Sequence, residues 1–207
     1  VINFTPTLLE QIEEYSRQVR GFLHDTQAIR DPILAALAQP VISTDPHQRV
    51  TLARACLRVN EKRLIDRFPP YRRLADMMTW LHQHPEGIAY LSDQFLVDIV
   101  VWYHLAWLGE TVRRTDPRAQ RLIARGTGYS LHDRRELLTL IGELLDTVID
   151  RYKVLAKNER IELSYTPYAH PILPLLLDLN SVKEAMPAAQ MPLLASYPGG
   201  EARARWH

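Results

Sequence analysis

The sequence has a single cysteine, Cys56, among 207 residues. One cysteine excludes an intrachain disulfide and leaves no pair of thiolates for a metal ion. This composition fits a reducing cytoplasm, although a cysteine-poor secreted protein would share it. Long apolar runs are also missing, because PILPLLL and FLVDIVVWY are too short or carry a charge, and a membrane span needs roughly 18 residues. We therefore expect a soluble, cytoplasmic protein with no membrane partner.

The sequence also lacks an excess of charge of one sign. Its 25 Lys and Arg nearly balance its 24 Asp and Glu, for a formal net charge of +1. Surfaces that bind nucleic acid are strongly basic. The basic pairs at 72–73, 113–114 and 134–135 are scattered along the chain, which we interpret as solvated helix faces. No nucleic-acid partner is expected.

Short catalytic and ligand-binding motifs are absent as well. The glycines of RGTGYS lack the preceding strand and the following lysine of a phosphate-binding loop. There is no GxSxG nucleophile elbow. The eight histidines include no pair at the i, i+4 spacing of a helical zinc motif with an intervening glutamate. We therefore predict no metal and no cofactor.

What the sequence does contain is mostly helical periodicity. Capping residues, prolines and apolar spacing predict helices over the following ranges: 6–23, a short helix after Pro32, one from the turn cluster at 43–47 to Pro69, 71–81, 94–108 and 131–156. The helix at 94–108 is apolar so far round its circumference that we expect it to be buried between others. Residues 113–130 are interpreted as a basic connection with two glycines.

Two segments favour strands. Residues 1–4 resemble the end of a strand, and residues 160–166 alternate between apolar and polar side chains. Two isolated strands do not make a stable sheet. Either they pair with each other under a helical layer, or the rest of the sheet lies outside this chain. A purely helical scaffold would require 160–166 to be something other than a strand.

The strand at 160–166 leads into a polar loop and then an apolar run that starts at Pro171. His170 therefore lies where β/α folds place groups that contact substrate, although a loop histidine is often only a surface or capping residue. Glu162 lies on the more polar side of the strand, and a buried carboxylate there needs a partner. An ion pair is the simpler interpretation of Glu162, and a site residue is the alternative.

Aromatic residues cluster at 102–107. Trp102, Tyr103, His104 and Trp107 could form a platform for sugar rings, because aromatic faces pack well on pyranoses. Their helical spacing favours core packing instead.

Three segments together resemble a known family. They are NFTPTLLEQIEEY at 3–15, VWYHLAWLG at 101–109 and RIELSYTPYAHPILPLLLD at 160–178. In order and content they resemble glycoside hydrolase family 57, whose members act on α-glucans such as starch and glycogen. The segment at 160–178 is similar to the second sequence region of that family, and the resemblance spans nearly the whole chain.

The resemblance implies an α/β fold. Residues 1–207 would form part of a catalytic domain built as an irregular seven-stranded β/α barrel, this part mostly helical with a few short parallel strands. Residues 5–157 would be largely a helical insertion and barrel helices, and 160–178 a strand, loop and helix lining the cleft. His170 would bind the α-glucan substrate, with Tyr168 and Glu162 as its neighbours in the motif.

The same resemblance places the reacting groups elsewhere. The family's histidine-rich HxHxPY-like strand end would precede residue 1, and its nucleophilic Glu and acid/base Asp would follow residue 207. Retaining glycosidases need two carboxylates roughly 5 Å apart. Glu162, in a strand, and Asp178, a turn into the following helix, are not interpreted as substitutes, so no catalytic residue is assigned.

Several expectations follow. The chain alone should be inactive, both of its ends look cut, and exposed strand edges should cause self-association or low solubility. Amylase, pullulanase, glucanotransferase and branching enzyme activities are not distinguished by this region. The alternative function is a non-catalytic helical module that binds carbohydrate or another protein.

Overall fold

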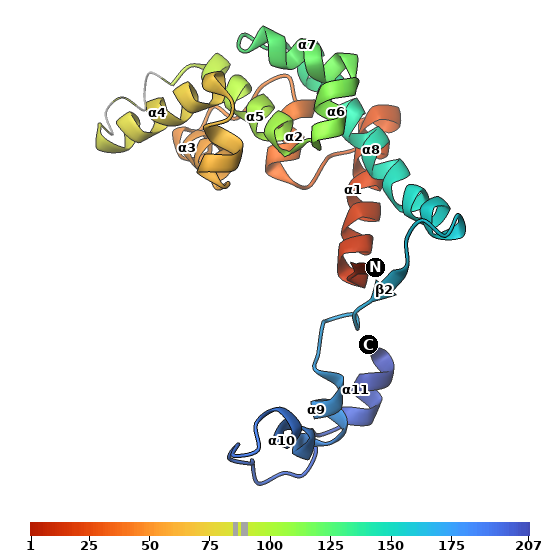
Figure 1. Cartoon of the computed structure of the whole chain (residues 1–207). Helices are drawn as coiled ribbons and strands as arrows, with labels where there is room; N and C mark the ends of the chain where they lie inside the picture. The colour runs from red at the N-terminus through yellow and green to blue at the C-terminus, as the bar shows by residue number, and fades with distance from the viewer. Residues whose placement is uncertain (85–86, 88–90) are drawn as a thin grey trace. The chain divides into compact units, whose positions relative to one another are not determined.

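Helices dominate the computed structural model, which describes residues 1–84, 87 and 91–207 (Figure 1). In chain order the elements are β1 (Ile2–Phe4), α1 (Pro6–Asp25), α2 (Pro32–Ala38), α3 (Pro46–Cys56), the π-helix η1 (Glu61–Ile65), α4 (Pro69–Gln83), α5 (Asp93–Trp107), α6 (Glu110–Thr115), α7 (Pro117–Arg125), α8 (Leu131–Lys157), β2 (Leu163–Tyr165), α9 (Leu173–Leu177), the 3₁₀-helix η3 (Leu179–Ser181), α10 (Val182–Ala185) and α11 (Gly200–Trp206). No helix in these described ranges is long and apolar enough to cross a membrane.

The chain divides into two compact units. We call Val1–Glu14 with Leu145–His207 the strand unit, because it holds β1 and β2, and Tyr15–Leu144 the helical unit. The boundary between the units falls within α1 and within α8.

Helix α5 is the centre of the helical unit. It packs against α2, α3 and α4, and its buried residues lie all round the helix, among them Leu96, Ile99 and Trp102. This confirms the expectation of a buried helix at this position. Ser92 begins α5 by accepting a hydrogen bond from the Phe95 amide at 3.1 Å, as a helix N-cap does.

Two predicted elements of the helical unit are wrong. The single helix expected from the 43–47 turn to Pro69 ends at Cys56, whose carbonyl accepts a hydrogen bond from the buried Tyr71 hydroxyl. A separate π-helix follows, begun by Asn60, which caps the Arg63 amide. Periodicity could not show this break, because the apolar spacing continues across it.

The basic connection expected at 113–130 is also largely helical. Asp116 caps α7 by accepting from the amides of Arg118 and Ala119. Gly126 and Gly128 then turn the chain toward α8 with φ angles of 77° and 74°, a backbone conformation that glycine adopts without steric cost.

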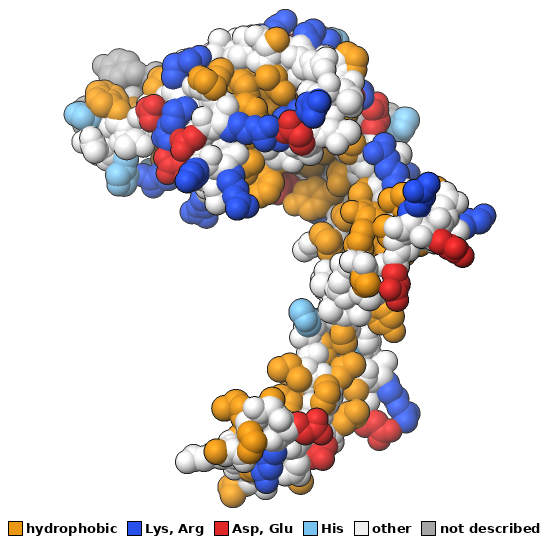
Figure 2. All heavy atoms as spheres, viewed as in Figure 1, with side chains coloured by type: hydrophobic (Ala, Val, Ile, Leu, Met, Phe, Trp, Pro, Cys, Tyr) orange, Lys and Arg blue, Asp and Glu red, His pale blue; other side chains and the backbone are white. Residues whose placement is uncertain are grey.

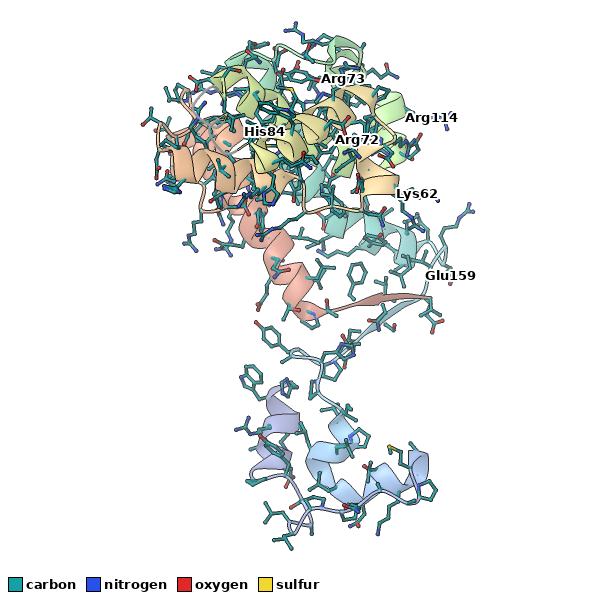
Figure 3. The ribbon with its side chains drawn as sticks, turned by 90° about the vertical axis from the view of Figure 1, so that its left-hand side faces the viewer. Lys62, Arg72, Arg73, His84, Arg114 and Glu159 are labelled. Carbon is teal, nitrogen blue, oxygen red and sulfur yellow. The ribbon has the colours of Figure 1, made fainter. Side chains whose placement is uncertain are left out.

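The arginine pairs are less solvated than expected. Arg134 is only 3% exposed, and its guanidinium donates to the carbonyls of Ala36 and Gln39 at 2.7 and 2.8 Å, at the end of α2. Arg72, on α4 (Figure 3), is held by Glu61, Asp66 and Asp76. Arg134 thus binds the carbonyl-rich end of a helix, which attracts a cation, and Arg72 belongs to a local group of ion pairs. Neither is simply a solvated charge on a helix face.

The strands β1 and β2 pair with each other in parallel. Ile2 lies opposite Leu163 and Phe4 opposite Tyr165, and the Asn3 side-chain Nδ2 donates a hydrogen bond to the Ser164 hydroxyl at 3.0 Å. The pairing excludes a purely helical scaffold. Strand β2 is shorter than the predicted 160–166, since the Arg160 amide still bonds the Leu155 carbonyl at the end of α8.

Helices α9 and α11 pack closely in the strand unit. Buried Gly200 lies against the Leu176 carbonyl, so near that a β-carbon built at position 200 would be 1.7 Å from that oxygen. Apolar side chains are nevertheless prominent on the surface of this part of the strand unit (Figure 2), as in the following set: Ile172, Leu177, Met186, Leu193, Leu194, Tyr197 and Trp206.

Candidate functional site

The predicted polar loop is a tight turn at the end of β2. The Thr166 amide extends the parallel ladder by donating to the Phe4 carbonyl at 3.0 Å, and the chain then leaves the sheet. Residues 167–170 form a turn closed by a hydrogen bond of 2.8 Å from the His170 amide to the Pro167 carbonyl. The turn and α9 follow the strand as the sequence predicted, because proline on both sides of His170 excludes continued strand pairing.

His170 has an unusual backbone conformation. Its φ angle is 55°, in the left-handed region, and it precedes Pro171. A residue before proline prefers extended backbone, and a non-glycine residue held in a sparsely populated region costs on the order of 1–3 kcal/mol. Its side chain is exposed. Thr26 and Glu159 have the same φ angle, but of the three only His170 precedes a proline and lies in a loop after a strand.

Tyr168 is held by hydrogen bonds to both stretches of chain that form the strand unit. Its hydroxyl donates a hydrogen bond to the Glu10 carboxylate on α1, and its backbone amide donates to the His207 carbonyl at 3.2 Å. The hydrogen bond to Glu10 raises the pKa of Tyr168 above its ordinary value, because the carboxylate favours the neutral phenol. Tyr168 is therefore a neutral hydrogen-bonding group whose position is held.

Two residues that the sequence did not single out complete this site. The rings of Tyr168 and Trp206 have centroids 5.3 Å apart, and those of Trp206 and His207 are 4.8 Å apart. The Ala169 amide also bonds the His207 imidazole at 3.3 Å. Figure 1 shows the end of α11 beside the segment after β2. A separation of nearly forty residues gave no periodic signal that could have joined α11 to the turn.

Glu162 lies at the other end of β2 from this turn. Its carbonyl accepts from the Ile2 amide at 2.8 Å, just before the strand, and its side chain is exposed. The buried ion pair preferred from the sequence is therefore wrong. At about 3.3 Å per residue, the strand separates Glu162 from Thr166 by roughly 13 Å. Asp178 lies just after the last residue of α9, where it caps η3, and not inside a helix.

The aromatic residues at 102–107 mostly belong to the core of the helical unit. Trp102 is 1% exposed and donates to the Gly126 carbonyl at 2.7 Å, which confirms core packing. Desolvation lowers the pKa of His104 to about 4, so this imidazole is neutral at pH 7. Trp107 alone among the four is prominent on the surface, at 58% exposed.

Other parts of the described structure have fewer groups that could bind a polar ligand or react with it. A groove of about 490 Å³ in the helical unit is lined by α2 and α3, but its described lining includes no Trp, Tyr, Phe, Asp or Glu. Burial raises the pKa of the Cys56 thiol to about 12, which disfavours thiol chemistry. Within residues 1–84, 87 and 91–207, no group of three His, Cys, Asp or Glu could hold a metal ion.

The site at the turn therefore offers hydrogen-bonding groups and aromatic rings on the surface. Glu10, Tyr168 and His207 supply carboxylate, phenol and imidazole, and Trp206 supplies a large apolar face. Amphipathic ligands with several hydroxyl groups and apolar C–H faces suit this combination.

Comparison with known families agrees with this chemistry. The sequence profile described as Glycosyl hydrolase family 57 matches residues 23–191, which include α2 to α10 and the turn. The chain therefore belongs to glycosyl hydrolase family 57. At the level of the family, membership implies hydrolysis or transfer of glycosyl groups on α-glucans. Searches of curated proteins and of solved structures give no match.

Proposed function

We propose that this chain is part of a retaining glycosidase or glucanotransferase that acts on α-glucans such as starch, glycogen and maltooligosaccharides. The observation that carries the proposal is the family match over 23–191, which includes the strained turn at 167–170. The aromatic and hydroxyl-binding groups around this turn support a sugar ligand.

The fold proposed for the whole domain is an irregular seven-stranded β/α barrel. Residues 1–207 would be part of it, with 5–157 largely a helical insertion and barrel helices. The parallel pairing of β1 with β2 supports this, because parallel strands need a crossover connection between them. Tyr165 is 79% exposed on β2, as expected if further structure covers this face of a larger sheet.

Within that domain, residues 160–178 would line the substrate cleft. His170 and Tyr168 bind sugar hydroxyls from the turn, and Glu162 contributes from the opposite end of β2. A polymer can reach both places, since β2 is only three residues long. The turn supports the role of His170, because the hydrogen bond from its amide to the Pro167 carbonyl places this exposed residue in the loop that follows β2.

Catalysis would require two further carboxylates. A retaining mechanism places a nucleophile and an acid/base roughly 5 Å apart. Glu162 lies before β2 and Asp178 after α9, and Asp178 already accepts a hydrogen bond from the Asn180 amide at 2.9 Å. We propose that both catalytic groups come from sequence outside residues 1–207, so that this chain alone is inactive.

The test compares this chain with a longer protein that extends it at both ends, as the proposal requires. The longer protein should release or rearrange maltooligosaccharides from amylose, and the 207-residue chain should not. In the longer protein, His170→Ala should lower kcat/KM about tenfold or more, because a bound hydroxyl loses its partner. His132→Ala, at an exposed histidine of α8, is the matched control and should leave kcat/KM unchanged.

Two results would refute the proposal. Robust hydrolysis by the 207-residue chain alone would contradict the location of the carboxylates. A longer protein that binds amylose without any turnover would instead support the alternative of a carbohydrate-binding module.

A further inference from the structure

Trp206 is an exposed aromatic residue of the strand unit, as Tyr165 is. Its side chain is 68% exposed at the last position of α11, although tryptophan is on average a highly buried residue. An indole on the surface lacks the free energy that burial of its apolar area would give, so a ligand that covers the ring would gain that free energy.

The contacts of Trp206 hold its ring without covering it. The ring plane of Tyr168 lies at 77° to the indole plane and that of His207 at 73°, so both neighbours meet Trp206 edge to face. A parallel neighbour would cover a face of the indole, whereas these perpendicular contacts leave most of its surface to solvent. The ring is thereby held in place with a flat apolar surface accessible.

Hydrogen-bonding groups lie next to this surface. The Glu10 carboxylate binds the Tyr168 hydroxyl, and the His207 imidazole binds the Ala169 amide. A pyranose ring presents C–H groups on its faces and hydroxyl groups at its edge, which suits a flat aromatic surface with polar groups at the side. The Glu10 carboxylate oxygens can accept further hydrogen bonds from sugar hydroxyls, which a purely apolar partner cannot donate.

We propose that Trp206, with Tyr168 and His207, forms an aromatic subsite that binds one glucose unit of an α-glucan by stacking on the indole. This inference rests on the proposed function, since it shares the turn with His170. It adds residues of α11 that the family profile, which ends at 191, does not include. Trp206 binds substrate and takes no part in bond cleavage.

The test is titration of the 207-residue chain with maltoheptaose, followed by calorimetry. Trp206→Leu keeps an apolar side chain and removes the ring, and it should weaken binding about tenfold or more, as truncation of an aromatic anchor does. Trp206→Phe should recover most of the affinity. Trp107→Leu, at the 58% exposed tryptophan of α5, is the matched control and should bind as the unaltered chain does.

The outcomes separate this inference from the proposed function. Equal affinity of Trp206→Leu and the unaltered chain would overturn the subsite and leave the glycosidase proposal standing. Absence of maltoheptaose binding by a folded, unaltered chain would also overturn the subsite. In that case, amylose turnover by the longer protein, lowered by His170→Ala, would still support the proposed function.

Discussion

The contact between α9 and α11 predicts a large effect of one methyl group. Gly200 is buried, and a β-carbon at this position would lie 1.7 Å from the Leu176 carbonyl oxygen and 2.7 Å from its carbon. These are backbone atoms, so no side-chain rotation can relieve the clash. Gly200→Ala must therefore separate α11 from α9 by more than an ångström before the contact becomes an ordinary one.

Overpacking of this kind costs about 1–3 kcal/mol. If this free-energy cost is confined to the contact between α9 and α11, it lowers the hydrogen-exchange protection of the amides in these two helices about 5- to 140-fold, since 1.4 kcal/mol is a factor of ten. The displacement also moves Trp206, at the end of α11, away from Tyr168. The strand unit should lose its aromatic contact while α5 of the helical unit keeps its protection.

Hydrogen exchange followed by mass spectrometry measures this directly. Peptides covering 173–177 and 200–206 should exchange faster in Gly200→Ala, and peptides from 93–107 should not change. Gly109→Ala is the control, because a β-carbon at Gly109 would meet nothing within 4 Å and its φ of −58° suits alanine. Unchanged exchange at 200–206 would refute the close packing of α11 on Leu176.

Three further outcomes are expected. Burial lowers the pKa of His104 to about 4, whereas its value in the unfolded chain is near 6.5. The free energy of unfolding should therefore be highest above pH 6.5 and fall by up to about 3 kcal/mol as the pH approaches 4. In urea unfolding, His104→Leu should lose less stability with acid than the unaltered chain, and an equal dependence of the unfolding free energy on pH would contradict this. Asp98 is 5% exposed and accepts hydrogen bonds from the backbone amides of Gly128 and Tyr129. Asp98→Asn should therefore lower the free energy of unfolding, measured by thermal unfolding, by about 1–3 kcal/mol. The control Asp93→Asn, at a side chain that is 75% exposed, should lower it by less than about 1 kcal/mol. The exposed apolar side chains of the strand unit should make the 207-residue chain self-associate, and a monomer by light scattering at high concentration would count against it.

Local patterns predicted much of the fold. The helices at 6–23, 94–108 and 131–156 agree with α1, α5 and α8 to within two residues at each end. Their caps and apolar spacing are properties of neighbouring residues, which is why the sequence alone shows them. The family resemblance likewise rested on contiguous motifs, and the match over 23–191 confirms it.

The failures occurred where a distant contact overrides a local pattern. The helix expected from 43–47 to Pro69 ends at Cys56, whose carbonyl accepts a hydrogen bond from the Tyr71 hydroxyl fifteen residues further along the chain. Arg134 looked like a solvated charge, yet it reaches carbonyls of α2 almost a hundred positions away. Nothing in the spacing around either residue carries that information.

In the candidate site, too, some features follow from neighbouring residues and others from distant contacts. Adjacent residues were enough to predict the family and the strand–turn–helix at the end of β2, and they are also the basis for proposing His170 and Tyr168 as substrate-binding residues. The tertiary contacts were needed to show that Glu10, Trp206 and His207 lie beside Tyr168 and that Glu162 lies at the opposite end of β2 from the turn. The physical reason is that α11 reaches the turn through its packing on α9, which depends on a glycine at position 200.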